Sequence, residues 1–210
     1  MDEEHGLPAA RVFDALGAEY ERAFADSATH HASLQRLLGH IPPRSRVLDV
    51  GSGTGRPTAQ TLADAGHQVL GVDVSPVMVD LAARHVPGAT FVCADIRELP
   101  LEERSFDVVC SYFSLLQMSR DDQSRLLRRL GRLLLPGGVL AVATVPLDVE
   151  DADVVFMGQE VQATSFGAEA FSELVAGAGF TILWEQCGPF TPAYEGAVAE
   201  PQLFLHCERV

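Results

Sequence analysis

Residues 47–59 read V-L-D-V-G-S-G-T-G-R-P-T-A. An apolar run ending at Val50 leads directly into glycines at every second position, which are Gly51, Gly53 and Gly55. A glycine-rich turn after a buried strand lets the backbone approach a ligand closely, because no Cβ stands in the way. The stretch therefore predicts a ligand site at the carboxyl end of a first strand, Arg46–Val50, in an α/β sheet.

Short apolar segments alternate with helical patterns beyond this stretch. We expect further strands at Gln68–Val72, Thr90–Cys93, Phe106–Ser111, Val139–Val145, Phe180–Gln186 and Gln202–Glu208. Apolar strands separated by helices are typical of a parallel sheet that is covered on both faces. The link between the last two segments lacks a helical pattern, which predicts that these two strands pair antiparallel.

Helical patterns precede the first strand and separate the later ones. A single apolar stripe predicts a helix over Arg11–Ala25, and a second helix follows over about 28–38. Ser75 before Pro76, and Ser119 before two acids, have the composition of helix N-termini. At 210 residues with 47% hydrophobic content, the chain is long enough for one domain with a sizeable core.

Composition narrows the class of partner. The net charge is −14, whereas nucleic-acid-binding proteins present a basic surface to phosphates, so we expect neither nucleic acid nor an anionic membrane as partner. The chain contains no apolar run long enough to span a bilayer, and its start, M-D-E-E-H-G, lacks the features of a secretory signal. These features predict a cytoplasmic protein. The four cysteines, Cys93, Cys110, Cys187 and Cys207, have no metal-site or disulfide spacing, and we interpret all of them as buried thiols.

The glycine spacing and the acids that follow discriminate between two cofactors. A dinucleotide fingerprint is G-x-G-x-x-G, whereas this loop is G-x-G-x-G. Asp73, after the second strand, does not separate the two cofactors, because a carboxylate there can accept the hydroxyls of the adenosine ribose that both contain. The third strand ends in V-C-A-D-I-R-E-L-P-L, and the fourth is followed by a helix that ends in L-L-L-P-G-G-V-L-A-V. In this order the motifs resemble the class I S-adenosylmethionine-dependent methyltransferases, particularly their small-molecule branch, over Val47 to Thr144.

The resemblance implies a Rossmann-like, doubly wound, mostly parallel seven-stranded sheet with helices on both faces and an N-terminal helical cap. It divides one domain, 1–210, into a cap (1–45), a cofactor-binding core (46–145) and a segment with a substrate-wall insert, a final helix and strands (146–210). It also implies that S-adenosylmethionine is bound by Tyr20, Asp49, Gly51, Ser52, Gly53, Thr54, Gly55, Asp73, Val74, Met78, Asp95, Ile96, Ser111 and Tyr112.

Individual roles follow from the same resemblance. Asp49 is expected to hold the methionine amino group, Asp73 the ribose hydroxyls and Asp95 the adenine amino group, while Gly51 and Gly53 admit the cofactor's close approach. Asp49 also stands out on physical grounds, because a carboxylate in an apolar strand is costly without a partner. Tyr20 is a candidate contact of both cofactor and substrate, although its place on an apolar stripe fits plain core packing equally well.

The acceptor and its chemistry are less defined. Methyl transfer from a sulfonium is an in-line displacement, so the protein contributes mainly orientation, and a general base is needed only for a protonated acceptor. His30, His31 and Gln117 are weak candidates for catalysis, and Gln117 also for a substrate contact; surface placement and helix capping are the alternatives. The sequence lacks the acid–Asn cluster of a magnesium site like that of catechol-type O-methyltransferases, the Asn/Asp-Pro-Pro-Tyr motif of amino-methylating DNA enzymes and the paired-glutamate loop of the protein-arginine type. These absences predict a metal-independent enzyme that acts on a small molecule.

The segment Pro146–Glu160 is the expected variable wall of the substrate site. Phe156 and Met157 could contact an apolar substrate, and the acids Asp148, Glu150, Asp151 and Asp153 could attract a cation or could simply be solvated. Two other functions stay open on the sequence alone, namely cofactor binding without turnover and, less favoured, a nicotinamide-dependent oxidoreductase. The oligomeric state is not predicted.

Overall fold

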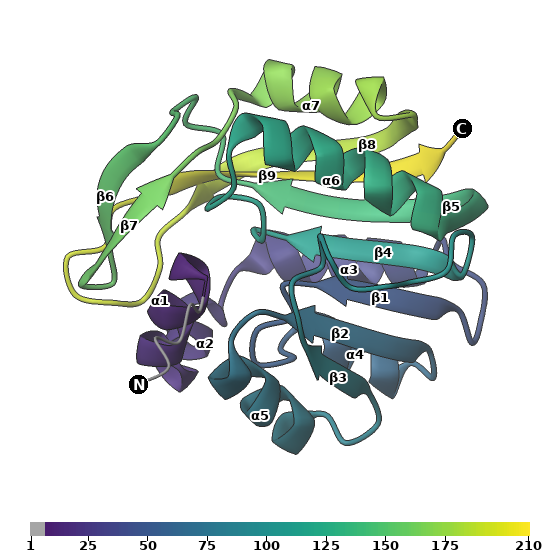
Figure 1. The fold of residues 1–210 in the computed structure, drawn as a ribbon, viewed down its shortest axis with the longest axis horizontal. Helices are drawn as coiled ribbons and strands as arrows, with labels where there is room; N and C mark the ends of the chain where they lie inside the picture. Colours follow the sequence, from purple (N-terminus) through teal and green to yellow (C-terminus); the bar gives the residue numbers. More distant parts are fainter. Residues whose placement is uncertain (1–6) are drawn as a thin grey trace.

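A computed structural model describes residues 7–210 of the chain. The expectation that the first six residues are not part of a secretory signal lies outside this range. Seven strands form one twisted sheet in the order β3-β2-β1-β4-β5-β9-β8 (Figure 1). The first five pair in parallel, whereas β9 runs antiparallel to both β5 and β8. The strands are β1 (Arg46–Val50), β2 (Gln68–Asp73), β3 (Thr90–Cys93), β4 (Phe106–Tyr112), β5 (Leu134–Thr144), β8 (Phe180–Phe190) and β9 (Glu200–Arg209).

Helices cover both faces of this sheet, as the sequence predicted. One apolar core packs α6 (Arg120–Leu133) and α7 (Ala168–Gly177) against the sheet, and a second packs α3 (Ala28–Leu38) and α4 (Thr58–Asp64) against the opposite face. Helix α5 (Pro76–His85) lies beside β2 and β3. Ser75 and Ser119 cap α5 and α6 by accepting the amides of Met78 and Asp122.

The alternation along β1 decides where its acid points. Leu48 and Val50 belong to the core under α6, and Val47 belongs to the core under α3 and α4. Because side chains alternate between the faces of a strand, Asp49 lies on the same face as Val47. It therefore sits at the carboxyl end of the strand, on the side of α3 and α4.

The N-terminal cap consists of two short helices rather than the single expected one. The predicted helix over 11–25 is wrong in this respect: α1 (Pro8–Leu16) ends at Gly17, and α2 (Ala18–Phe24) begins after it. Gly17 has a φ of 49°, which is incompatible with a continuing α-helix and which glycine adopts without steric cost.

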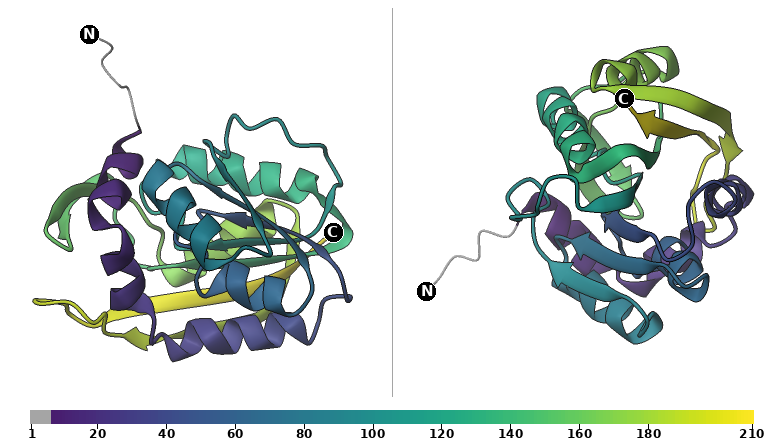
Figure 2. Two further views of the ribbon diagram at one scale, coloured as in Figure 1. Left: turned by 90° about the horizontal axis from the view of Figure 1, so that it is seen from below. Right: turned by 90° about the vertical axis from the view of Figure 1, so that its right-hand side faces the viewer.

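The segment after β5 contains an element that the sequence did not predict. β6 (Ala152–Phe156) and β7 (Gln159–Ala163) form a separate antiparallel hairpin. Its two-residue turn, Met157-Gly158, has φ values of 49° and 81°, the geometry of tight β-hairpins. The two side views show this hairpin and the N-terminal helices at one end of the sheet (Figure 2).

Two smaller features complete the fold. Cys110 and Cys207 are buried, but Cys93 and Cys187 are exposed, so the expectation of four buried thiols is wrong. Both exposed thiols lie on the edge strands β3 and β8, where one side of the sheet has no neighbour. Within residues 7–210, no helix combines the length and apolar character that a membrane span requires.

Candidate functional site

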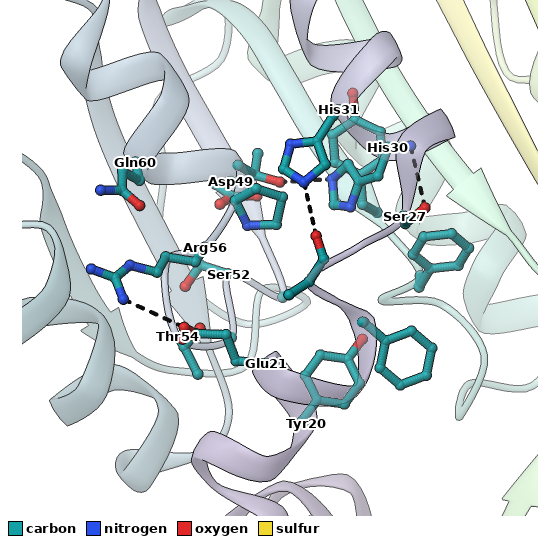
Figure 3. Close-up of a pocket in the computed structure, with 18 of the residues that line it drawn as sticks. Tyr20, Glu21, Ser27, His30, His31, Asp49, Ser52, Thr54, Arg56 and Gln60 are labelled. Atoms are coloured by element: carbon teal, nitrogen blue, oxygen red, sulfur yellow. Dashed lines mark hydrogen bonds and ion pairs between the residues drawn. The ribbon is translucent and has the colours of Figure 1, made fainter. Parts of the chain in front are cut away.

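A cavity of about 230 Å³ opens at the carboxyl end of β1, between the glycine loop and the N-terminal helices (Figure 3). Open α/β sheets bind ligands at this edge. The walls come from α2, α3, the loop after β1, the start of α4, the end of β4 and the start of β9. The lining residues are Tyr20, Glu21, Phe24, Ala25, Ser27, His30, His31, Asp49, Gly51, Ser52, Gly53, Thr54, Arg56, Pro57, Thr58, Gln60, Tyr112, Phe113 and Gln202.

Gly51 and Gly53 of the glycine loop have different surroundings. Gly53 has a φ of 51°, and a Cβ at this position would meet no atom of the chain within 4 Å, so its open side faces space. Gly51 has a φ of 66°, but a Cβ there would lie 2.4 Å from Ser114 Cβ. The expectation that ligand approach explains both glycines therefore needs correction, since at Gly51 the chain itself excludes a side chain.

The carboxyl group of Asp49 is buried and incompletely hydrogen-bonded. Its side chain is 2% exposed, and its Oδ2 atom has no hydrogen-bond partner within the chain. Burial, and then the charge of Asp73, raise the pKa of Asp49 to about 7. A buried carboxyl without a partner is costly, so this group fits a ligand that brings a cation or donors to the cavity.

Asp73 ends β2 and faces the glycine loop. Its Oδ2 accepts the Gly53 amide at 2.8 Å, and its Oδ1 accepts the Ser75 amide at 2.9 Å. Burial raises the pKa of Asp73, although these backbone hydrogen bonds oppose the rise. Each carboxylate oxygen keeps a further lone pair, so the side chain can still accept hydroxyl groups while it holds the loop.

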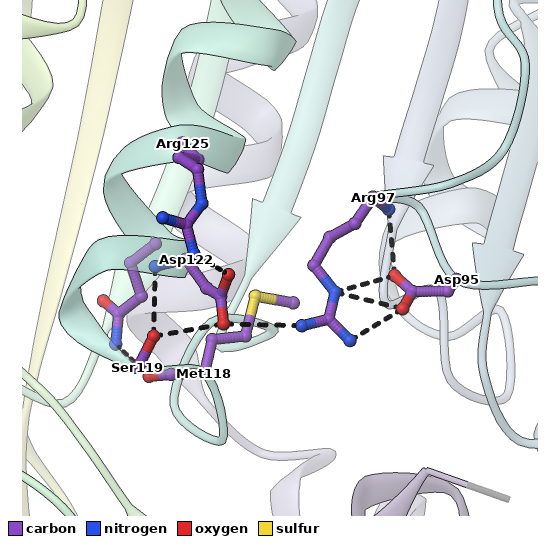
Figure 4. Close-up of polar contacts among 7 residues, drawn as sticks. Asp95, Arg97, Met118, Ser119, Asp122 and Arg125 are labelled. Carbon is purple, nitrogen blue, oxygen red and sulfur yellow. Dashed lines mark hydrogen bonds and ion pairs between the residues drawn. The ribbon is translucent and has the colours of Figure 1, made fainter.

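Asp95 follows β3 and is held by an arginine (Figure 4). Arg97 donates to both oxygens of Asp95, at 2.7–3.0 Å, and reaches Asp122 of α6 at 3.5 Å. Burial disfavours ionisation of Asp95, but the hydrogen bonds and charge of Arg97 outweigh it and lower the pKa of Asp95. The carboxylate is thus fixed and ionised, and each of its oxygens already accepts two donors of Arg97, the backbone amide among them.

The two histidines of α3 differ in environment. His30 is half-buried, its Nε2 lies 3.1 Å from Thr58 Oγ1, and burial lowers its pKa to about 3. His31 is exposed, with Nε2 2.8 Å from the Ala25 carbonyl. His30 is therefore neutral at physiological pH and is a weak proton acceptor.

The end of β4 supplies the floor of the cavity. The Tyr112 hydroxyl lies 2.9 Å from Ser33 Oγ, which in turn lies 2.8 Å from His206 Nε2. Burial raises the pKa of Tyr112 well above its ordinary value, so it stays a neutral phenol. Ser111 Oγ lies 2.7 Å from Ser114 Oγ, away from the cavity lining.

The structure brings together part of the predicted site. Inside the cavity lining are Tyr20, His30, His31, Asp49, Gly51, Ser52, Gly53, Thr54 and Tyr112. Outside it are Gly55, Asp73, Val74, Met78, Asp95, Ile96, Ser111, Gln117, Phe156 and Met157. Val74 follows β2, Met78 lies in α5, and Asp95 and Ile96 follow β3. Gln117 lies in the loop after β4. The functional roles of all these residues stay predictions.

The acids of the 146–160 segment serve local structure. Arg120 pairs with Asp148 at 2.7 Å and with Glu150 at 3.8 Å, which ties the segment to α6. Thr164 Oγ1 accepts the Asp151 amide at 2.9 Å. The side chains of Asp148 and Glu150 are 69% and 54% exposed and pair with Arg120, which fits the interpretation as solvated acids; attraction of a cation stays a prediction.

The sequence did not predict several of the residues that line the cavity. Glu21 of α2 reaches across the loop to Arg56 at 3.4 Å and to His85 at 3.3 Å. Gln202 Oε1 accepts the Ser27 hydroxyl at 3.1 Å, which joins β9 to α3. Charged and amide side chains on a surface helix or terminal strand carry no spacing signal, so only the tertiary fold places them at the cavity.

Comparison with known proteins agrees with this geometry. Residues 47–138 match the family described as "Methyltransferase domain". This core of the chain is therefore similar to methyltransferase domains. The matched range of the methyltransferase domain covers β1 to the first part of β5, and so includes the glycine loop and all three acids at the strand ends.

Two curated relatives of this chain illustrate the similarity. The 27-O-demethylrifamycin SV methyltransferase of Amycolatopsis mediterranei is 32% identical over 73% of this chain and 58% of its own. The dTDP-4-amino-2,3,4,6-tetradeoxy-D-glucose N,N-dimethyltransferase of Saccharopolyspora spinosa is 33% identical over 63% of this chain and 53% of its own. The chain spans about half the length of the curated relatives it matches.

Solved structures share the fold of this chain over nearly its whole length. The 1,6-didemethyltoxoflavin-N1-methyltransferase of Burkholderia thailandensis, solved with 1,6-didemethyltoxoflavin and S-adenosylhomocysteine, has a TM-score of 0.74 and 24% identity, covering 100% of this chain and 93% of its own. The [4+2]-cyclase SpnF has a TM-score of 0.73 and 22% identity, covering 96% of this chain and 95% of its own. The fold therefore occurs in proteins named for different reactions.

Proposed function

We propose that the protein binds S-adenosylmethionine and transfers its methyl group to a small-molecule acceptor. The observation that carries the proposal is the unpartnered Asp49 Oδ2, buried beside an open-sided Gly53 at the carboxyl end of β1. An amino-acid ammonium would pair with this carboxylate, and a cofactor lying against Gly53 would fill the space that has no side chain.

The residues at the strand ends match the rest of the cofactor. Asp73 would accept the ribose hydroxyls and Asp95, fixed by Arg97, the adenine amino group. Met78 and Ile96 are buried apolar side chains near this edge and would line the adenine with Val74. Arg56 is the arginine among the cavity-lining residues and would pair with the cofactor's carboxylate.

The cofactor supplies an electrophilic methyl group on a sulfonium, and the chain supplies orientation. Aligning two reactants in a water-poor site can lower a barrier by about 7–11 kcal/mol. The N-terminal helices, the end of β4 and the start of β9 line the cavity and would position the acceptor beside the methyl group. Burial lowers the pKa of His30 and makes it a weak base at neutral pH, which favours an acceptor that needs little proton abstraction. Independence from metal ions stays a prediction.

The direct test is transfer of an isotopically labelled methyl group from S-adenosylmethionine to a panel of small metabolites. Label recovered in a small molecule supports methyl transfer. Isothermal titration with S-adenosylmethionine accompanies it, and absence of saturable binding at millimolar cofactor would refute the proposal.

A second candidate is cofactor binding with another reaction or none. It is favoured by one observation, the strong likeness of the fold to a protein named as a cyclase. Tight binding of S-adenosylmethionine without labelled product across the panel would favour this candidate. Catalytic release of S-adenosylhomocysteine in the presence of an acceptor would exclude it.

A further inference from the structure

Five aromatic rings gather beside the cavity, where α2, the β6–β7 hairpin, the end of β8 and the loop after it meet. Tyr20 lies 4.9 Å from Phe24 and 6.3 Å from Phe156, measured between ring centroids. Phe190 lies 5.9 Å from Phe24, and Tyr194 lies 6.5 Å from Phe156. We call these five residues, Tyr20, Phe24, Phe156, Phe190 and Tyr194, the aromatic cluster. Tyr20 and Phe24 also line the cavity, so the cluster is continuous with it.

A carboxylate lies within this cluster. Glu200 begins β9 and pairs directly with Phe190 across the antiparallel ladder, so the two side chains share a face of the sheet. Its negative charge acts on both phenols, raising the pKa of Tyr20 and of Tyr194 in addition to the effect of their burial. Glu200 therefore shares a face with one ring of the cluster, and its charge is felt by the two phenols.

The same strand fixes Glu200 toward the cavity. Gln202, two residues further along β9, lies on the same face and lines the cavity. Its Nε2 donates to Glu200 Oε1 at 3.1 Å, while its Oε1 accepts the Ser27 hydroxyl. The carboxylate is thus held by a wall residue rather than free to turn into solvent.

Glu200 has no cationic partner among the residues that the structure describes. It is half-buried, and neither arginine nor histidine of residues 7–210 forms an ion pair with it. Burial raises the pKa of this carboxyl, and the Gln202 hydrogen bond only partly offsets the rise. An incompletely solvated carboxylate beside a cluster of aromatic rings is an environment that attracts an organic ammonium, through ion pairing and cation–π contacts together.

We propose that Glu200 and the aromatic cluster recognise a basic nitrogen of the acceptor, which makes the substrate a small amine with an apolar or aromatic body. This inference rests on the proposed function, because it assigns the acceptor side of the same cavity. The ammonium is paired with Glu200, and the body packs among the rings. The nitrogen bound in this way is a recognition group, so the proposal assigns no proton transfer to Glu200.

The test compares two probes of nearly equal shape, phenethylamine, which is cationic, and 2-phenylethanol, which is neutral. Binding is measured by calorimetry on the wild-type protein saturated with S-adenosylhomocysteine. We expect phenethylamine to bind about tenfold or more tightly than 2-phenylethanol, the scale of one charge-assisted hydrogen bond. Equal affinities of the two probes would overturn the proposal without any variant.

Variants locate the effect. Glu200→Gln should weaken phenethylamine about tenfold and leave 2-phenylethanol unchanged. Glu195→Gln, an exposed acid of the neighbouring loop, is the matched control and should change neither. Unchanged phenethylamine binding in Glu200→Gln overturns the proposal. So does a selective loss of S-adenosylmethionine relative to S-adenosylhomocysteine, because Glu200 would then serve the sulfonium.

The design separates this inference from the proposed function. If S-adenosylhomocysteine does not bind the wild-type protein, the proposed function fails, and the probe comparison is repeated without it. A preference for the amine that depends on Glu200 then still supports the recognition site. If S-adenosylhomocysteine binds and the amine preference is absent, only the present inference fails.

Discussion

At the scale of single residues, Asp49 couples stability to function. Burial and the charge of Asp73 raise its pKa to about 7, whereas an aspartate in an unfolded chain ionises near pH 4. Between these values the folded protein binds more protons than the unfolded one. The contribution of Asp49 to the free energy of unfolding is therefore greatest below pH 4 and is lost as the pH rises through 7.

Asp49→Asn should stabilise the cofactor-free protein, and more at alkaline pH. Asparagine cannot ionise, so we expect its advantage over the wild type in free energy of unfolding to grow by about 2 kcal/mol between pH 5 and pH 8. Urea unfolding at both pH values measures this difference. Asp26→Asn, an exposed acid before α3, is the control. If the variant exceeds the wild type in free energy of unfolding by the same amount at both pH values, ionisation of Asp49 does not destabilise the folded protein.

Asp73→Ala tests the ribose assignment. Loss of a charge-assisted hydrogen-bond acceptor should weaken S-adenosylhomocysteine by about 1.5–3 kcal/mol, or roughly 10- to 150-fold in Kd. Calorimetric titration gives the value, with Asp80→Ala, an exposed acid of α5, as control. Thermal melting of both variants monitors the loss of the hydrogen bonds from Asp73 to Gly53 and Ser75. An unchanged affinity removes Asp73 from the cofactor site.

At the scale of elements, α2 is fastened across the glycine loop. Glu21 pairs with Arg56 and His85, which belong to the loop after β1 and to α5. A bound cofactor would therefore lie beneath this helix. The cavity of about 230 Å³ is smaller than the roughly 300–1,000 Å³ of typical ligand pockets, as expected for an enclosed arrangement.

Glu21→Gln should loosen this closure. Partly exposed ion pairs contribute about 0–1 kcal/mol, so we expect association and dissociation of S-adenosylhomocysteine both to accelerate by up to about fivefold, with little change in Kd. Surface plasmon resonance measures both rates. Glu19→Gln is the matched control, because within residues 7–210 the ion pair of Glu19 is with Arg22 of the same helix. Rates equal to those of the wild type would mean that the ion pairs do not control access.

The elements also show what sequence reasoning could reach. Strands β1 and β3 have the predicted bounds, and the antiparallel pairing of the last two strands is confirmed, because apolar runs and missing helical patterns are local signals. The break at Gly17 and the β6–β7 hairpin were missed. An isolated glycine on an amphipathic stripe is compatible with a helix, and the Met157-Gly158 turn lacks the usual Asn-Gly or Asp-Gly signature.

At the scale of the whole molecule, strand direction explains which site residues could be predicted. Parallel strands bring their carboxyl ends to the ligand edge, so Asp49, Asp73 and Asp95 were recognisable from their place after apolar runs. Strand β9 is antiparallel and brings its beginning to the same edge. Glu200 and Gln202 therefore reach the site from the start of a terminal strand, which no local pattern indicates.

Cofactor binding should stabilise the whole molecule. S-adenosylhomocysteine at 100 times its Kd contributes about 2.7 kcal/mol, which raises the Tm of a domain of this size by about 5–10 °C. Differential scanning calorimetry measures the shift, and NADH at the same concentration is the control. A shift with NADH and none with S-adenosylhomocysteine would restore the oxidoreductase alternative.

The most direct measurement is a crystal structure of the protein grown with S-adenosylhomocysteine. The account predicts electron density against Gly53, with the amino group on Asp49 Oδ2 and the ribose hydroxyls on Asp73. Density elsewhere, or a cavity that stays empty in protein that binds the compound in solution, would contradict the assignment of this edge of the sheet as the cofactor site.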